Sequence, residues 1–189
     1  MKRTIFIITA FILLAGLNPA QSQAGGKATS GGSKLISGAL SFTSQGGDLY
    51  GGYSNERLNI VSITPSLFYF VSPGFGIGAD LSYDLRSRGS SSYTTLGVGP
   101  KIGYFSDAGE NLIPFFAGGV SFLTAGSDLG DINGMRFKFG GGVIIRRGQL
   151  GISIEATYLI DRYNLEGADG STTGDTIIFG VGLAGFLFD

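Results

Sequence analysis

The chain has 189 residues, a formal net charge of −1 at pH 7, no cysteine and no histidine. The charge argues against a nucleic-acid-binding protein, and the lack of cysteine excludes a lipoprotein and a domain held by disulfides. Without histidine, a serine hydrolase of the triad type is excluded as well.

The N-terminus has the features of a secretory signal peptide. Lys2 and Arg3 precede an apolar run over residues 5–17, which is short for a spanning helix, and Ser22 and Ala24 are the small residues that a signal peptidase reads. We expect residues 1–24 to be a cleaved signal peptide; an uncleaved anchor is the alternative. Residues 25–33, GGKATSGGS, have the composition of a flexible linker. Residues 34–189 are expected to form one domain.

From residue 34 on, apolar residues alternate with small or polar ones, which is the period of a strand with two unlike faces. Residues 75–86, for example, read FGIGADLSYDLR, with an apolar residue at every odd position. The pattern predicts eight strands near residues 34–43, 57–71, 75–86, 93–105, 113–123, 135–147, 150–161 and 175–188. Most of these have the length of tilted strands that cross a bilayer, which is about ten residues.

The predicted connections alternate in length. Short ones are expected at 72–74, 106–111 and 148–149, and long ones at 44–56, 87–92, 124–134 and 162–174. Short periplasmic turns and longer outer loops are typical of outer-membrane barrels, and an even strand number places both termini in the periplasm. Pro65 and Pro100 lie inside predicted strands, where we expect β-bulges.

The predicted fold class is all-β, an eight-stranded antiparallel up-and-down transmembrane β-barrel. Charged residues are almost confined to one face of the strands, so we expect the other face to meet lipid. Parity and distance from the short turns predict that Lys101 lies close to Asp80 or Glu155 in the lumen, with Lys138 and Arg136 higher up. Separate hydration of each charge is the alternative.

Motifs for catalysis or cofactors fail on inspection. Residues 180–185 match G-x-G-x-x-G, but a dinucleotide site needs a following helix and the chain ends four residues later. Residues 128–134, DLGDING, lack the calcium ligands expected at places one and twelve of an EF-hand loop. Asp80 and Asp84 are roughly 13 Å apart along one strand and cannot share a proton. We therefore expect no catalytic residue, cofactor or metal site; loose divalent bridging between loop acids and lipopolysaccharide is an alternative.

Three segments carry a resemblance to a known superfamily: ITPSLFYFV at 63–71, LGVGPKIGYF at 96–105 and FGVGLAGFLF at 179–188. They resemble the small outer-membrane β-barrels that include outer-membrane protein X, the opacity proteins and the membrane domain of outer-membrane protein A. The resemblance implies an assembly signal at Phe179, Phe186 and Phe188, although Asp189 follows the final aromatic residue. It also implies the barrel-assembly machinery, periplasmic chaperones, outer-membrane lipids and lipopolysaccharide as partners.

The leading functional hypothesis is a non-enzymatic outer-membrane protein whose loops serve adhesion, envelope integrity or resistance, with an external ligand on the loops. A narrow, porin-like channel for ions or small solutes is the alternative. An eight-stranded barrel has a lumen that side chains can fill, which argues against the channel, whereas the many glycines leave room for water. A soluble secreted ligand-binding barrel is a third hypothesis. No nucleic acid is expected as a partner.

Overall fold

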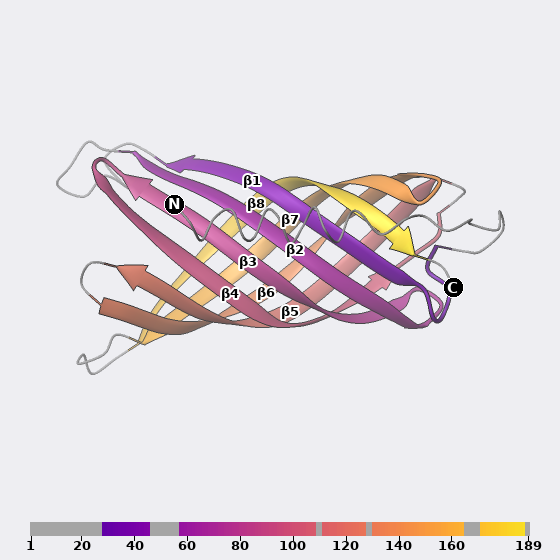
Figure 1. Ribbon diagram of the computed structural model, residues 1–189, viewed down its shortest axis with the longest axis horizontal. Coiled ribbons are helices and arrows are strands. Elements are labelled where there is room, and N and C mark those ends of the chain that lie inside the picture. Colours follow the sequence, from indigo (N-terminus) through magenta and orange to yellow (C-terminus); the bar gives the residue numbers. More distant parts are fainter. Residues whose placement is uncertain (1–27, 46–56, 109–110, 128–129, 165–170, 188–189) are drawn as a thin grey trace.

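Eight strands account for nearly all of the chain that the structure describes. This computed structural model describes residues 28–45, 57–108, 111–127, 130–164 and 171–187. Each strand pairs antiparallel with the next and β1 pairs with β8, so the sheet closes into the predicted eight-stranded barrel (Figure 1). The strands are β1 (Lys34–Gln45), β2 (Leu58–Ser72), β3 (Phe75–Arg88), β4 (Ser91–Phe105), β5 (Leu112–Ser127), β6 (Gly130–Arg147), β7 (Leu150–Asn164) and β8 (Ser171–Leu187).

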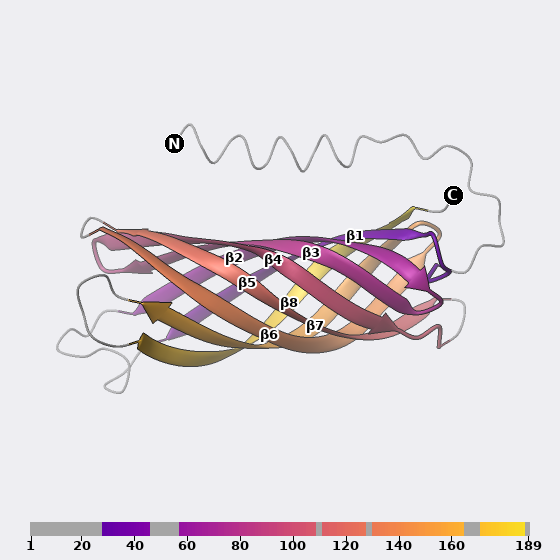
Figure 2. The ribbon, with the colours of Figure 1, turned by 90° about the horizontal axis from the view of Figure 1, so that it is seen from below.

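The barrel has two unlike ends, which lie at opposite ends of its long axis in Figures 1 and 2. At the terminal end, β1 begins, β8 ends, and residues 73–74, 106–111 and 148–149 connect the strands. At the loop end, the connections are residues 46–57, 89–90, 128–129 and 165–170. No helix in the described part of the chain has the length and apolar character needed to cross a membrane.

The prediction of long connections at 87–92 and 124–134 is wrong. β3 continues to Arg88 and β4 begins at Ser91. In the same way, β5 continues to Ser127 and β6 begins at Gly130. Backbone pairing satisfies the peptide groups of a hairpin whatever its side chains are, so strands extend beyond the point where the apolar alternation ends. The loop end is therefore built partly from polar hairpins.

The lipid-facing and lumen-facing residues alternate along every strand, as the sequence pattern predicts. Exposed large apolar side chains cover the outside; examples are Val98, Ile102, Ile154 and Val181, each more than half exposed. The same strands turn serine, glycine and charged residues inward. This is the arrangement of a membrane barrel, and it argues against the soluble secreted barrel, in which the apolar face lines the cavity.

The bulges expected at Pro65 and Pro100 are absent. The β2–β3 register is the same on either side of Pro65, and the β4–β5 register is the same on either side of Pro100. Each proline instead leaves a short unbridged stretch on the side where its N–H is missing, because an extended strand tolerates the proline φ angle but not the lost donor. The register shift in β2–β3 lies between Phe70 and Ser72.

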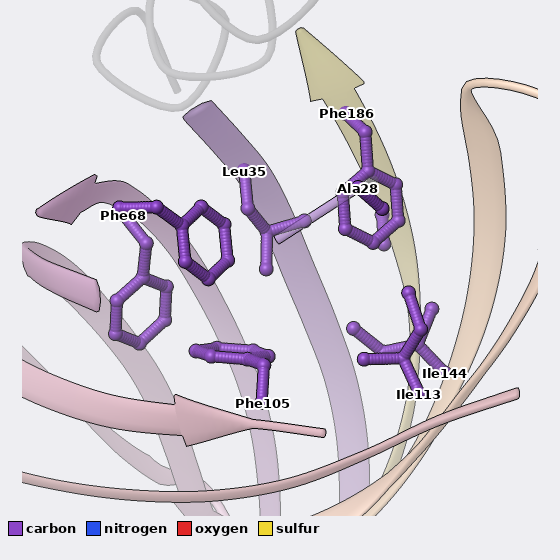
Figure 3. Close-up of a cluster of buried hydrophobic side chains, with 9 residues drawn as sticks. Ala28, Leu35, Phe68, Phe105, Ile113, Ile144 and Phe186 are labelled. Atoms are coloured by element: carbon purple, nitrogen blue, oxygen red, sulfur yellow. The ribbon is translucent and has the colours of Figure 1, made fainter. Parts of the chain in front are cut away.

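A cluster of buried apolar side chains fills the lumen at the terminal end (Figure 3). Its ring centroids lie close, with Phe105 5.0 Å from Phe68 and 5.2 Å from Phe70, both edge to face. Gly103 makes room for these rings, because a Cβ there would lie 2.8 Å from Phe105 Cε2. We call this cluster the plug; its buried members are Ala28, Leu35, Phe68, Phe70, Phe105, Ile113, Ile144, Ala184 and Phe186.

Residues 28–33 pack against the plug rather than forming the expected flexible linker. Ala28 and Thr29 are 2% and 3% exposed. The N–H of Gly32 donates to the carbonyl of Phe70 over 2.8 Å, and Thr29 Oγ1 donates to Asp107 Oδ2 over 3.0 Å. Glycine and serine content predicted flexibility, but these hydrogen bonds and the burial of Ala28 fix the segment at the terminal end. The remaining residues of the expected linker, 25–27, and the expected signal peptide, 1–24, lie outside the described residues.

Candidate functional site: the barrel lumen

Charged side chains of β3, β4, β6 and β7 point into the lumen beyond the plug, toward the loop end. Because faces alternate along a strand, the parity that buries Asp80 also buries Asp84, and the parity that buries Arg136 also buries Lys138. The exposed fractions are 4% for Asp80, 2% for Arg136 and 8% for Lys138. Such burial is tolerable only where charges are paired.

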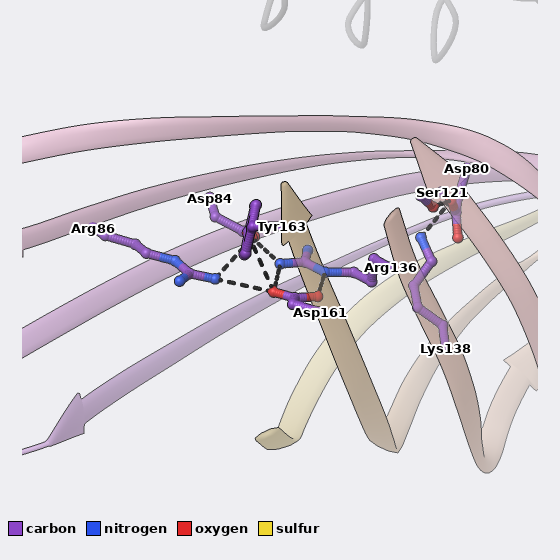
Figure 4. Close-up of polar contacts among 8 residues, drawn as sticks. All are labelled: Asp80, Asp84, Arg86, Ser121, Arg136, Lys138, Asp161 and Tyr163. Atoms are coloured by element: carbon purple, nitrogen blue, oxygen red, sulfur yellow. Dashed lines mark hydrogen bonds and ion pairs between the residues drawn. The ribbon is translucent and has the colours of Figure 1, made fainter. Parts of the chain in front are cut away.

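Arg136 is the centre of the group of charges nearer the loop end (Figure 4). Its Nε and Nη2 donate to the two carboxylate oxygens of Asp161 over 2.6 and 2.8 Å, a bidentate arrangement. Arg136 Nη2 also lies 2.8 Å from Asp84 Oδ2. Arg86 Nη2 contributes a second cation, 3.4 Å from Asp161 Oδ2 and 3.8 Å from Asp84 Oδ2. We call Arg86, Arg136, Asp84 and Asp161 the arginine group; its two arginines and two aspartates balance in charge.

Asp80 is the centre of a second group, one step closer to the plug. Lys138 Nζ donates to Asp80 Oδ1 over 2.5 Å, and Lys101 Nζ lies 3.8 Å from Asp80 Oδ2. Ser121, whose side chain is fully buried, donates its hydroxyl to Asp80 Oδ1 over 3.2 Å. Lys101 Nζ also lies 4.7 Å from the centre of the Phe68 ring, at the edge of the plug. We call Asp80, Lys101, Lys138 and Ser121 the lysine group.

Glu155 lies beside the lysine group without joining it. It lines, with Lys101, Lys138 and Asp80, a cavity of about 80 Å³. Among the described residues, no cation lies within 4.0 Å of its carboxylate. Neighbouring Gly180 leaves space in front of this side chain, since a Cβ there would lie 3.6 Å from Glu155 Cγ. Within the described part of the chain, Glu155 is thus a carboxylate at a polar cavity that shares its lining with Lys101 and Lys138 but contacts neither directly.

The five charges that the sequence singled out all point into the lumen, but they do not form one network. Lys101 lies near Asp80 rather than Glu155. Lys138 was expected to lie higher in the lumen than Asp80, and this prediction is wrong. Its ammonium group donates a hydrogen bond directly to Asp80. Strands of a barrel are tilted and staggered, so counting residues from a turn on one strand does not give the height of a residue on another. The paired row runs from Lys101 through Gly119 to Lys138, and this row places the two lysines together.

Sequence reasoning missed Asp161, Arg86 and Ser121 as members of these groups. Each has the parity of a lumen residue, in step with Glu155, Asp84 and Leu123 respectively. The available signal was therefore the alternation itself, because all three residues lie within the predicted strands 75–86, 113–123 and 150–161. What parity could not supply was the partner across the barrel.

The three aromatic residues of the expected assembly signal occupy different surroundings. Phe179 faces outward and is 77% exposed, whereas Phe186 is fully buried in the plug. Phe188 lies outside the described residues. The structure thus gives Phe186 a role in packing, and the assembly signal itself stays a prediction.

The lumen narrows toward the terminal end. A second cavity, of about 40 Å³, lies between the lysine group and the plug and is lined by Lys101, Glu155, Phe68 and Phe105 among others. Each cavity has room for a few water molecules. Within the described residues, no group of three or more acidic, histidine or cysteine side chains could hold a metal ion. The arrangement neutralises charge inside a narrow barrel.

Comparison with known proteins rests on structure alone, because no family model and no curated protein matches the sequence. Neisserial surface protein A superposes with a TM-score of 0.55 at 13% identity, over 81% of this chain and 94% of that one. The outer membrane protein OprG from Pseudomonas aeruginosa superposes with a TM-score of 0.51 at 13% identity, over 85% and 98%. The fold is that of the small outer-membrane β-barrels. At this identity the likeness defines the fold and not the activity.

Proposed function

We propose that the chain is a non-enzymatic outer-membrane barrel that acts through its loop end, in adhesion, envelope integrity or resistance. The observation that carries this proposal is the filled lumen: an apolar plug at the terminal end and two charge-paired groups beyond it. Because side chains occupy the interior, the parts of such a barrel that can contact other molecules are its outer surface and its loops.

The bacterial outer membrane is the proposed location, with both termini in the periplasm and lipopolysaccharide around the loop end. The apolar outer face supports a lipid environment. The short connections and the meeting of β1 and β8 at the terminal end support the orientation. The superposed proteins from Neisseria and Pseudomonas are described as surface or outer-membrane proteins, which agrees with the same location.

The narrow channel is the weaker candidate. The two cavities, about 80 and 40 Å³, are lined by charged and polar residues, which favours some internal water. The plug, however, lies between them and the terminal end, and its aromatic rings are in edge-to-face contact. An ion would have to displace these rings to cross the barrel.

Acid–base catalysis by the lumen aspartates is disfavoured by their ion pairs. Asp80, Asp84 and Asp161, the buried or half-buried lumen aspartates, each lie within 4.0 Å of at least one cation. A carboxylate held in this way is a poor general base, because its charge is already compensated. The proposal therefore assigns these residues to stability.

The test of the proposed function is an exchange of loop-end sequence. Residues 46–56 are replaced by a glycine-serine segment of equal length, and expressing cells are assayed for attachment to host matrix protein, serum survival and resistance to detergent. We expect at least one of these to fall while the amount of heat-modifiable barrel in the outer membrane stays the same. The matched control replaces residues 106–111 at the terminal end and leaves all three unchanged. Loss of none of the three in the loop-end exchange would contradict the proposal.

Insertion by the barrel-assembly machinery, with periplasmic chaperones as escorts, is part of the same proposal. If the terminal aromatic residue is the signal, removal of residues 188–189 lowers the outer-membrane yield far more than removal of residue 189 alone. The yields are compared by blotting of isolated membranes. Equal yields from the two truncations would show that Phe188 is not read.

A further inference from the structure

The seam between β1 and β8 is closed at the terminal end and open at the loop end. Pairing of the two strands stops at Leu40↔Val181. Beyond this pair, β1 continues along β2 and β8 runs along β7, but no pair joins residues 41–45 to residues 171–180. In Figure 1 the two strands diverge toward the loop end. We call these two unpaired edges, residues 41–45 and 171–180, the open seam.

Part of the open seam lies in the apolar belt of the barrel. Phe42 and Phe179 point outward from its two edges and are 67% and 77% exposed. An unpaired strand edge has a row of free N–H and C=O groups, and lipid offers these groups no hydrogen bonds. In a membrane, the partner that satisfies such an edge is another strand.

The ion pairs of the lumen explain why the two edges stay apart. Arg86 of β3 and Arg136 of β6 both contact Asp161 of β7, and Arg136 also contacts Asp84 of β3. These contacts hold β3, β6 and β7 together across the lumen. The strands β1, β2 and β8 contribute no member to the arginine group, so its ion pairs do not draw the edges of the open seam together.

The two edges match each other in direction, register and face. β1 and β8 are antiparallel, and continued pairing past Leu40↔Val181 would place Phe42 opposite Phe179. Because faces alternate in step on the two strands, every further pair would put apolar side chains outside and small or polar ones inside. Each edge is therefore a template for the other.

The edges are also complementary in charge. Arg57 donates its Nε to Ser44 Oγ over 3.1 Å, so its guanidinium lies beside the β1 edge. Asp175, on the β8 edge, accepts a hydrogen bond from Tyr158 over 3.2 Å. Both charged residues are exposed, and neither has an ionic partner within 4.0 Å among the described residues. Continued pairing would make Asp175 the diagonal neighbour of Ser44 on the outer face, within reach of Arg57.

A second copy of the chain offers both edges in the direction that is needed. A two-fold axis parallel to the barrel axis places β1 of one copy antiparallel to β8 of the other, as in an exchange of identical elements between protomers. We infer that the open seam is a dimerisation surface, on which residues 41–45 of each copy pair with residues 176–180 of the other. Residues 34–40 stay paired within their own barrel. The dimer is independent of the loop-end function proposed above.

Disulfide trapping between two singly substituted copies tests this pairing, because the chain has no cysteine of its own. Phe42→Cys and Phe179→Cys copies, with tags of different size, are reconstituted together in lipid vesicles and oxidised. We expect a disulfide-linked heterodimer, since opposed residues of antiparallel strands have the Cα separation that a disulfide needs. The matched control mixes Val98→Cys with Phe122→Cys, two exposed residues that oppose each other in the paired β4–β5 ladder, and should give only collisional background.

Charge reversal tests the same surface without any cysteine. Arg57→Glu should raise the dissociation constant of the dimer by about tenfold, because a symmetric dimer loses two ion pairs at once. Asp175→Arg should do the same, and a chain with both changes should dimerise as the parent does. Sedimentation in mild detergent measures the three constants.

The outcomes separate a second copy from the other ways to close the seam. Absence of the heterodimer from the mixed copies would overturn the inference, and an internal disulfide in a chain with both cysteines would then show that the barrel closes its own seam. As much heterodimer from the β4–β5 control would also overturn it, because random collision would explain the cross-link. A parent that sediments only as a monomer would contradict the dimer directly.

Discussion

The two halves of the lumen are stabilised by different physics. The plug at the terminal end contains aromatic and aliphatic side chains that lose water on packing, and each contributes in proportion to the area and volume it fills. The arginine and lysine groups contain charges that are costly to bury. Removal of one member destabilises the barrel because its partners stay buried without a counterion.

This difference predicts unlike responses to mutation. In the plug, a smaller side chain removes contacts and leaves a cavity, so its effect grows with the volume removed. Among the charged groups, the effect depends on the number of buried partners that lose their counterion and hardly on volume. Five substitutions test this contrast, in order of the expected loss in the free energy of unfolding.

Arg136→Ala should have the largest effect, because it removes the closest cation of both Asp84 and Asp161 and leaves Arg86 at the longer distances of 3.8 and 3.4 Å. We expect a loss of about 4 kcal/mol in the free energy of unfolding, within the range for breaking a buried ion pair. Urea unfolding in lipid vesicles, followed by circular dichroism, measures it. Arg136→Lys is the control; it keeps the charge but not the bidentate geometry and should recover only part of the loss. A loss below about 1 kcal/mol for Arg136→Ala would mean that these charges are hydrated separately.

Phe186→Ala should come next, at about 3 kcal/mol, because the ring is fully buried in the plug. Phe186→Leu keeps much of the volume and should cost about 1 kcal/mol. The same vesicle assay applies. If alanine and leucine had the same effect, volume would not be what the plug contributes, and the contrast with the charged groups would fail.

Lys138→Met and Lys101→Met separate the two cations of Asp80. Lys138 lies 2.5 Å from Asp80 Oδ1 and Lys101 lies 3.8 Å from Asp80 Oδ2. The closer contact is a hydrogen bond to a charged group, so we expect about 2 kcal/mol for Lys138→Met and less than about 1 kcal/mol for Lys101→Met. The reverse order would place Lys101 as the principal partner, as parity and turn distance had predicted.

Glu155→Ala should have the smallest effect, about 0.5 kcal/mol or less, because the change leaves no buried charge without a partner. If Lys101 were paired with Glu155, one of the two arrangements that the sequence predicts, the same change would strand Lys101 and cost far more. In the structure Lys101 keeps Asp80 as its counterion, so the cation is not stranded. A loss near that of Arg136→Ala would restore the sequence-based network and remove Glu155 as a free carboxylate.

Much of the fold could be predicted from the sequence, because apolar and polar residues alternate along each strand of a membrane barrel. Alternation placed the eight strands, and Gly148, at the two-residue turn between β6 and β7, has the positive φ of 65° that such a turn needs. The polar hairpin ends could not be predicted, because residues 87–88 and 124–127 pair through the backbone without an apolar face. The packing of Ala28 and Thr29 was hidden for a related reason: glycine and serine around them are typical of linkers.

The sequence predicted which charged residues line the lumen, but it did not predict which of them form ion pairs across the barrel. Parity placed Asp80, Lys101, Arg136, Lys138 and Glu155 inside. Contacts across the barrel depend on the stagger between strands, which no single strand encodes. Asp161, by contrast, is the direct partner of Arg136 in the β6–β7 ladder, so the two-residue turn at 148–149 carried the signal for that pair.

The central claim, that the plug closes the lumen, is tested most directly by single-protein conductance in planar bilayers. The parent barrel should give no stepwise currents. The double variant Phe105→Ala/Phe186→Ala, which removes two fully or nearly fully buried rings from the plug, should give small, regular steps from the same preparation. Stepwise currents from the parent, of the same size as those of the double variant, would contradict a closed lumen and favour the channel.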